Sequence, residues 1–191
     1  MFRGYPLKRR VPSGGRCEAR SMTETEQATR SRTFSWADPA ETAARVGRSS
    51  GLEMLRAMRD GELPAPPILH LVGGTEIEVE EGKVTVLMPV AEFHYNPLGT
   101  VHGGVIATLL DTAAGCTVHS TLPAGVGYTS LDLMTRFIKP VTIDSGLLRC
   151  EGGIISRGRR TAVAEAHLYD ERGKLLAHAT SNCLLFELPQ A

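Results

Sequence analysis

The sequence of 191 residues contains no run of about 18 consecutive apolar residues, the length that a transmembrane helix requires. Its basic N-terminal stretch lacks the apolar core of a secretory signal. The four cysteines are far apart and form no CxxC pair, so neither a zinc site nor a disulfide framework is indicated. We therefore expect a cytoplasmic protein without membrane association, metal or other cofactor.

The sequence also lacks a net charge, since its 21 Lys/Arg balance its 21 Asp/Glu. The balance is uneven, however, because residues 1–21 carry six Lys/Arg and one Glu, which leaves the other 170 residues with a net charge of −5. A mildly acidic body argues against a general nucleic-acid-binding role. The hydrophobic fraction of 42% and charged fraction of 22% are ordinary for a globular domain.

The length suits one domain with an extension. Residues 1–35 are polar and basic, and we expect them to be disordered or poorly ordered. Residues 36–191 are expected to form the single folded domain. Two interpretations stay open for residues 1–21: a transit peptide, or untranslated sequence before a start at Met22, which we favour.

Hydrophobic periodicity and turn residues predict an α+β domain. Asp38 before Pro39 predicts the N-cap of a helix over 36–46, and a second, amphipathic helix is predicted over 49–59. The proline-rich stretch 63–68 predicts an extended connector. A long apolar helix follows a loop and covers 103 to about 120. The predicted strands span 69–79, 83–90, 127–138, 146–156, 160–169 and 175–187. An antiparallel sheet of about six strands wrapped around one helix would leave its outer face and edges for a second subunit to cover.

Residues 94–112, HYNPLGTVHGGVIATLLDT, join a glycine-containing loop, a helix start and one carboxylate. Gly103 and Gly104 let a ligand come close to the free N–H groups of the helix start. Those N–H groups and the helix dipole favour negative charge. Asp111 lies in the apolar helix, where a carboxylate costs free energy unless it is paired or used. The helix thus offers an oxyanion site and a candidate base or nucleophile.

The spacing of these two features has a geometric consequence. Gly103 and Asp111 are eight residues apart, or about 12 Å along a helix axis. A base must lie within about 3 Å of the atom that it serves, or act through one water. One reacting carbonyl cannot easily use both groups of the same helix. Two helices antiparallel across a two-fold axis would bring each start near the middle of its partner. The active unit is therefore predicted to be a dimer.

Other polar residues near this stretch are candidates for supporting roles. Asn96 is expected to contact an acyl carbonyl or orient water, although Asn-Pro is also a common turn signal. His102 is expected either to cap and orient the backbone or to touch substrate. Thr129 and Ser130, on the following predicted strand, are the hydroxyls expected to partner Asp111. A structural ion pair is the alternative explanation for a carboxylate at position 111.

The motif N-x5-H-G-G-x6-D, from Asn96 through His102, Gly103 and Gly104 to Asp111, resembles the signature of the PaaI-like acyl-CoA thioesterases of the hotdog-fold superfamily. The segment SLDLMTRFIKPV (130–141) resembles the strand after that family's central helix, and the likeness covers roughly residues 50–187. It implies a hotdog dimer, often a tetramer, without metal. Gly103 would supply the oxyanion-hole N–H, Asn96 would help to bind the thioester carbonyl, and Asp111 of the facing subunit would be the nucleophile or general base. Motif alignment favours Ser130 as the assisting hydroxyl, with Thr129 as a rival.

Two alternatives have the same architecture. Enoyl-CoA hydratases of this superfamily resemble D-x-N-P-x-H, but His94 stands here where their Asp would be. A non-catalytic acyl-CoA-binding protein would have no need of Asp111. The predicted substrate is an acyl-CoA, with an acyl group that the sequence does not identify. Gly104 and a group of basic residues are the expected contacts to it: Arg136, Lys139, Arg157, Arg159 and, in the same hairpin, Arg160.

Overall fold

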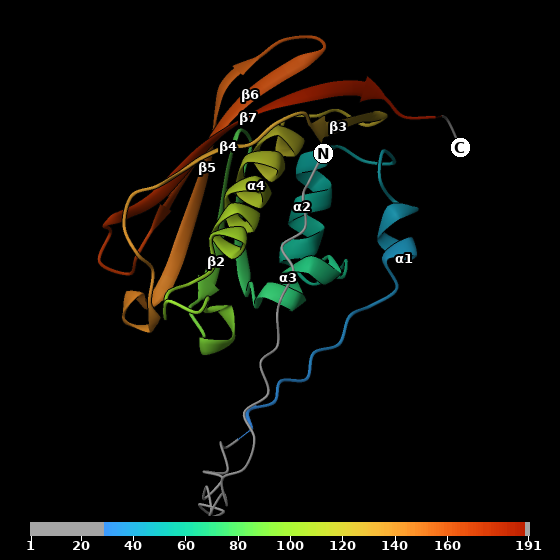
Figure 1. Cartoon of the computed structure of the whole chain (residues 1–191). Coiled ribbons are helices and arrows are strands. Elements are labelled where there is room, and N and C mark those ends of the chain that lie inside the picture. Colours follow the sequence, from blue (N-terminus) through green and yellow to red (C-terminus); the bar gives the residue numbers. More distant parts are fainter. Residues whose placement is uncertain (1–28, 190–191) are drawn as a thin grey trace, which may run out of the picture. The chain divides into compact units, whose positions relative to one another are not determined.

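Helix α4 (Gly103–Ser120) lies against the inner face of an antiparallel sheet that contains seven strands within the described part of the chain (Figure 1). The computed structural model describes residues 29–189, and from Thr33 onward they belong to one compact unit. The strand order is β1-β2-β5-β6-β7-β3, and β4 also pairs with β7. The strands are β1 (Glu76–Glu80), β2 (Lys83–Pro89), β3 (Val126–Ser130), β4 (Met134–Phe137), β5 (Leu147–Arg157), β6 (Thr161–Tyr169) and β7 (Leu175–Glu187). The predicted α+β hotdog architecture is confirmed.

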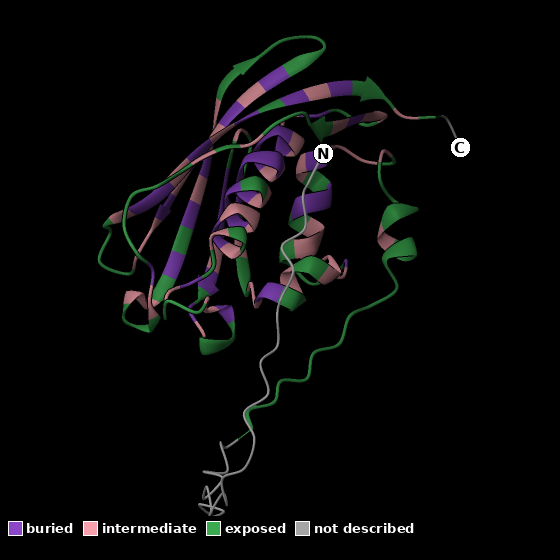
Figure 2. Ribbon diagram, viewed as in Figure 1, coloured by how far each residue is buried: buried purple, intermediate pink, exposed green. Residues whose placement is uncertain are grey.

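The core lies between α4 and the sheet. Helical positions such as Leu109, Leu110 and Ala113 are fully buried, and they meet alternate residues of β5 and β6, among them Leu148 and Leu168 (Figure 2). Period 3.6 on the helix and period 2 on the strands place these side chains in one layer. The sheet therefore holds α4 rigidly along the face opposite to Asp111.

Short helices precede the sheet. Helix α1 (Pro39–Ala43) begins after Asp38, whose side chain accepts a hydrogen bond from the Ala40 N–H, so the predicted N-cap is confirmed. Helix α2 (Gly51–Arg59) begins with a capping box between Ser50 and Glu53. Helix α1 ends at Ala43, before the predicted range does, and α2 starts at Gly51 because Ser50 is its N-cap.

The predicted strand over 69–79 is wrong in its first half. Residues Pro67–Val72 form helix α3 instead, and β1 begins only at Glu76. Pro67 occupies the first helical turn, where proline is favoured, and Gly73 ends the helix in the left-handed conformation with φ of 79°. The same helix shortens the predicted extended connector, which stops at Pro66.

The predicted single strand over 127–138 is also wrong, since it is divided into β3 and β4. At the break, the Asp132 carboxylate accepts hydrogen bonds from the backbone and side-chain N–H groups of Asn182 on β7. A side chain thus takes the place of a strand carbonyl. The four remaining strands were predicted to within one residue at each end.

The expectations for the basic stretch 1–21 and for a start at Met22 fall outside the described residues. Within residues 29–189, no helix combines the length and apolar character needed to cross a membrane.

Candidate active site

Asp111 and Ser130 face each other across a shallow cleft. The Ser130 hydroxyl donates a hydrogen bond to Asp111 Oδ1 at 3.2 Å. The cleft, of about 350 Å³, lies between α4 and the segment after β3, and Gly104 and Thr108 also line it. The carboxylate is exposed in the single chain, so the expectation that the apolar helix buries it is wrong. Asp111 projects from the face of α4 that the sheet leaves uncovered.

Thr129 points to the other side of the sheet from its neighbour Ser130, since side chains alternate along a strand. It pairs with Leu184 of β7 and is exposed. Of the two hydroxyls that the sequence left open, only Ser130 is hydrogen-bonded to Asp111.

The first turn of α4 leaves one backbone donor unused. His102 is the N-cap residue, and its Nδ1 accepts a hydrogen bond from the Gly104 N–H at 2.9 Å. The N–H groups of Val105 and Ile106 donate to the carbonyl oxygen of His102. Among residues 29–189, the Gly103 N–H has no acceptor. His102 therefore has a backbone-orienting role, and Gly103 rather than Gly104 retains a free donor.

Gly103 is packed closely by an aromatic ring. A Cβ atom added at this position would lie 3.2 Å from Phe137 Cζ. Gly103, Asn96, Phe137 and Lys139 share the lining of a second cleft, of about 350 Å³. This cleft shares no lining residue with the cleft of Asp111. One chain therefore presents the free N–H and the carboxylate at two separate surfaces.

The Asn96 side chain shapes the loop before α4. Its Oδ1 accepts a hydrogen bond from the Leu98 N–H at 2.8 Å, and its Nδ2 donates to Thr100 Oγ1 at 3.1 Å. The turn interpretation of Asn96-Pro97 is therefore correct. One of the two Nδ2 hydrogens is enough for the bond to Thr100, so the amide still has a donor to offer beside Gly103.

His94 anchors the same loop from inside the protein. It is only 3% exposed, its Nδ1 accepts a hydrogen bond from the Ala91 N–H, and its Nε2 lies 2.6 Å from the Val72 carbonyl oxygen. The His102 N–H donates to the His94 carbonyl. Both ring nitrogens are thus occupied in holding the loop, which leaves His94 unsuited to the Asp/His chemistry of a hydratase.

The structure separates the predicted basic residues. Lys139 lies beside Gly103, whereas Arg136 is exposed on β4 opposite His178. Arg157 and Arg159 are exposed at the β5–β6 turn, at the opposite end of α4 from Gly103 (Figure 1). A single chain therefore does not gather these side chains around one site.

Two residues near Ser130 were missed by the sequence analysis. Asp132 holds the segment after Ser130 through Asn182, and these hydrogen bonds lower the pKa of the Asp132 carboxyl. Tyr128 packs against Gly115 of α4, and burial raises the pKa of its hydroxyl. The sequence signal for the break was Asp132 itself, because aspartate is rare within strands.

A long helix wrapped by an antiparallel sheet is the arrangement of the hotdog class of proteins. Residues 98–177 match the family described as the Thioesterase superfamily. Acyl-coenzyme A thioesterase 13 of Mus musculus is 31% identical over 104 residues, which cover 54% of this chain and 73% of that protein. The first relatives found are matched over about two thirds of their length, from 66% to 73%.

Solved structures give the same result. A phenylacetic acid degradation-related protein from Ralstonia eutropha JMP134 has a TM-score of 0.62 and 30% identity, covering 68% of this chain and 98% of its own. A thioesterase from Haemophilus influenzae has a TM-score of 0.56 and 26% identity, covering 60% and 80% respectively. The chain belongs to the thioesterase superfamily of hotdog proteins, as its motif predicted.

Proposed function

We propose that this protein hydrolyses an acyl-CoA thioester to a free acid and CoA, at two equivalent sites of a homodimer. The observation that carries the proposal is the unpaired Gly103 N–H at one end of α4, together with the Ser130-bound carboxylate of Asp111 in its middle. An unpaired N–H is suited to a developing oxyanion, and a positioned carboxylate is suited to general-base or nucleophilic catalysis.

In the proposed reaction, the thioester carbonyl oxygen accepts a hydrogen bond from Gly103 of one chain, with Asn96 beside it. Asp111 of the facing chain takes a proton from water, whose oxygen attacks the carbonyl carbon. The carbon–sulfur bond then breaks, and the proton passes to the CoA sulfur. Direct attack by the Asp111 carboxylate, followed by hydrolysis of the anhydride, is the alternative course. Ser130 and His102 act as positioning residues, on Asp111 and on the helix start.

The free edge of the sheet supports the dimer. Leu131, Met134 and Phe137 are 60%, 58% and 57% exposed, and all three follow or form the β3–β4 edge. Exposed apolar side chains on an unpaired edge strand favour pairing with another chain. Pairing of two copies along this edge would set the two α4 helices antiparallel, with each Asp111 facing the partner's helix start.

The same pairing suggests how the phosphates of CoA are held. Lys139 lies beside Gly103, and a two-fold axis would carry the Arg157 and Arg159 turn of the partner toward that end of α4. Arg136, on the β3–β4 edge, is the remaining candidate. Guanidinium and ammonium groups are the usual phosphate ligands among side chains.

The direct test is steady-state release of free thiol from a panel of acyl-CoA esters. We expect Asp111→Asn and Asp111→Ala to lower kcat by about 10²-fold or more, the range for loss of a general base. Thr129→Ala, on the opposite sheet face, is the matched control and should stay within about twofold. Unchanged turnover in both Asp111 variants would remove Asp111 from the mechanism. Binding of acyl-CoA without thiol release would instead favour the non-catalytic alternative.

A further inference from the structure

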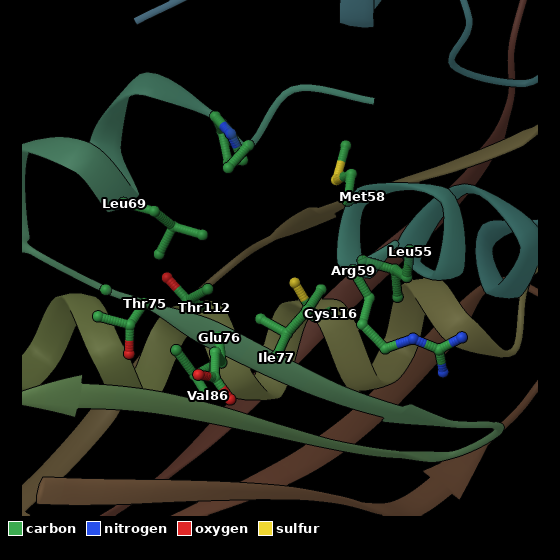
Figure 3. A pocket seen from close by; sticks show the side chains of 13 residues that line it. Leu55, Met58, Arg59, Leu69, Thr75, Glu76, Ile77, Val86, Thr112 and Cys116 are labelled. Atoms are coloured by element: carbon green, nitrogen blue, oxygen red, sulfur yellow. The ribbon is translucent and has the colours of Figure 1, made fainter. Parts of the chain in front are cut away.

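A third cavity, of about 380 Å³, lies beside α4, between helices α2 and α3 and the β1–β2 part of the sheet (Figure 3). Leu55 and Met58 of α2 and Leu69 of α3 form one wall, while Thr112 and Cys116 of α4 form the other. Ile77 of β1 closes the space between them. The cavity is thus built by the segment that precedes the sheet, together with the helix that carries Asp111.

The cavity has a structural cause. The start of α2 is fixed to the end of α4, because the Gly51 N–H donates to the Leu122 carbonyl at 2.9 Å. Gly51 lies so close to the His119 carbonyl that any side chain there would collide with it. After α2, the chain turns at Gly61 and runs through the prolines into α3. This course leaves a space between α3 and the α4 residues Thr112 and Cys116. A small core of Leu55, Val79 and Val84 keeps α2 in place.

Most of the lining is apolar, and its two hydroxyl groups already have partners. The Thr112 hydroxyl donates to the Thr108 carbonyl at 2.7 Å, and the Thr75 hydroxyl donates to the Leu87 carbonyl at 3.4 Å. The Arg59 guanidinium is held by Asp60. Burial raises the pKa of the Cys116 thiol to about 12, so the thiol is neutral at pH 7. These walls offer contact to hydrocarbon, and the exposed carboxylate of Glu76, which also lines the cavity, disfavours a negatively charged acyl group.

The cavity and the Asp111 cleft lie one helical turn apart on α4. Thr108 lines the Asp111 cleft, and Thr112 and Cys116 line the cavity. Residues four apart on a helix are neighbours on one face, about 6 Å from each other. A chain attached to a carbonyl next to Asp111 would cross this row and reach the space between Leu69 and Met58.

We propose that this cavity is the acyl subsite, and that it selects an uncharged, apolar acyl group of medium size. The inference rests on the proposed function and adds to it the class of substrate. The volume is near the lower end of the roughly 300–1,000 Å³ typical of ligand pockets, which is too small for a long fatty chain. An acetyl group would leave the apolar walls without contact, and each buried CH₂ contributes about 0.8 kcal/mol.

The test compares kcat/KM for acetyl-, octanoyl-, phenylacetyl- and palmitoyl-CoA in three proteins. Wild type is expected to prefer octanoyl- or phenylacetyl-CoA over acetyl- and palmitoyl-CoA by at least about tenfold. Leu69→Trp fills the cavity and should lower kcat/KM for the two medium-sized esters by about tenfold or more, with acetyl-CoA within about twofold. Ile68→Trp, exposed on the same helix, is the matched control and should behave as wild type. Met58→Phe repeats the test with a smaller insertion if Leu69→Trp does not fold.

The outcomes separate the two proposals. If Leu69→Trp and Met58→Phe release thiol from the medium-sized esters as fast as wild type does, the acyl subsite is overturned. The thioesterase proposal would then still stand. A wild type that prefers acetyl- or palmitoyl-CoA would overturn it as well. If wild type releases thiol from no ester, the proposed function fails. In that case, calorimetry with octanoic acid tests the cavity by itself. Octanoic acid should bind to wild type and should not bind to Leu69→Trp or Met58→Phe.

Discussion

The Ser130 hydroxyl and the Asp111 carboxylate are joined by a hydrogen bond of 3.2 Å, which connects the last residue of β3 to the middle of α4. A hydroxyl at this position orients the carboxylate. Ser130→Ala should therefore lower kcat by about tenfold, the equivalent of roughly 1.4 kcal/mol, with KM little changed. Ser130→Thr, which keeps the hydroxyl, should recover most of the activity in the same thiol-release assay. Equal losses in both variants would indicate a purely structural role.

The Gly103 N–H can be removed by a single substitution. Gly103 is the first residue of α4, where proline is accepted, and His102 before it is already extended, with φ of −60° and ψ of 135°. Gly103→Pro should lower kcat by about 10²–10³-fold, as for loss of an oxyanion-hole donor. Gly103→Ala adds a similar Cβ next to Phe137 but keeps the N–H, so it separates packing from hydrogen bonding. Proline and alanine variants of equal activity would exclude Gly103 as the donor.

The same variant tests the division of each site between two chains. Gly103→Pro and Asp111→Asn are each expected to be inactive as homodimers. When they are unfolded together and refolded in equal amounts, about half of the dimers are mixed, and each mixed dimer has one intact site. Activity should return to about a quarter of wild type. No recovery, with mixed dimers verified by mass spectrometry, would place both groups in one chain.

The exposed β3–β4 edge gives a prediction about assembly. Met134→Lys places a charge on the edge, a substitution that natural edge strands use against pairing. We expect the sedimentation coefficient to fall from that of a dimer to that of a monomer, and thiol release to fall at least about tenfold because the sites are incomplete. Ile155→Lys is the control, since Ile155 is 53% exposed at the far end of β5. A fully active Met134→Lys monomer would refute the two-chain site.

His119 predicts a loss of stability in mild acid. Burial lowers its pKa below the ordinary value of 6.5, and its Nδ1 is buried without a hydrogen-bond partner among the described residues. Below pH 6.5 the unfolded chain therefore binds a proton that the folded chain resists, and stability falls as pH falls. Between pH 7.5 and 5.5 we expect Tm to drop by roughly 2–4 °C more in wild type than in His119→Phe, the shift that about 1 kcal/mol causes in a domain of this size. Scanning calorimetry at both pH values measures this difference in Tm. An identical decrease of Tm in wild type and His119→Phe would contradict the role of His119.

The sequence was sufficient for the central helix and for most strands because their hydrophobic periods are unambiguous. It failed at 67–72, where a short apolar run fits a strand or a helix equally well. Proline at the start and Gly73 at the end decide for the helix. It also failed at 131–133, where the break depends on Asp132 meeting Asn182, 50 residues later. Contacts of that range leave no trace in local periodicity.

The candidate site was foreseen in its residues but not in its environment. Spacing along one helix was enough to separate Gly103 from Asp111. The choice between Thr129 and Ser130 depended on the strand register, which only the three-dimensional structure supplies. The exposure of Asp111 depends on which face of α4 the sheet covers. The wall that α3 gives to the acyl cavity could not be foreseen, because residues 69–72 were assigned to a strand.

The attachment of α2 to α4 at Gly51 and Leu122 has a thermodynamic consequence. In the proposed site, the acyl cavity and Asp111 belong to one chain and the Gly103 N–H comes from its partner, so a bound acyl-CoA would touch both chains. Substrate binding and subunit association are then linked equilibria. Saturating substrate should lower the dissociation constant of the dimer, and dilution of the protein should weaken the apparent affinity for substrate by the same free energy.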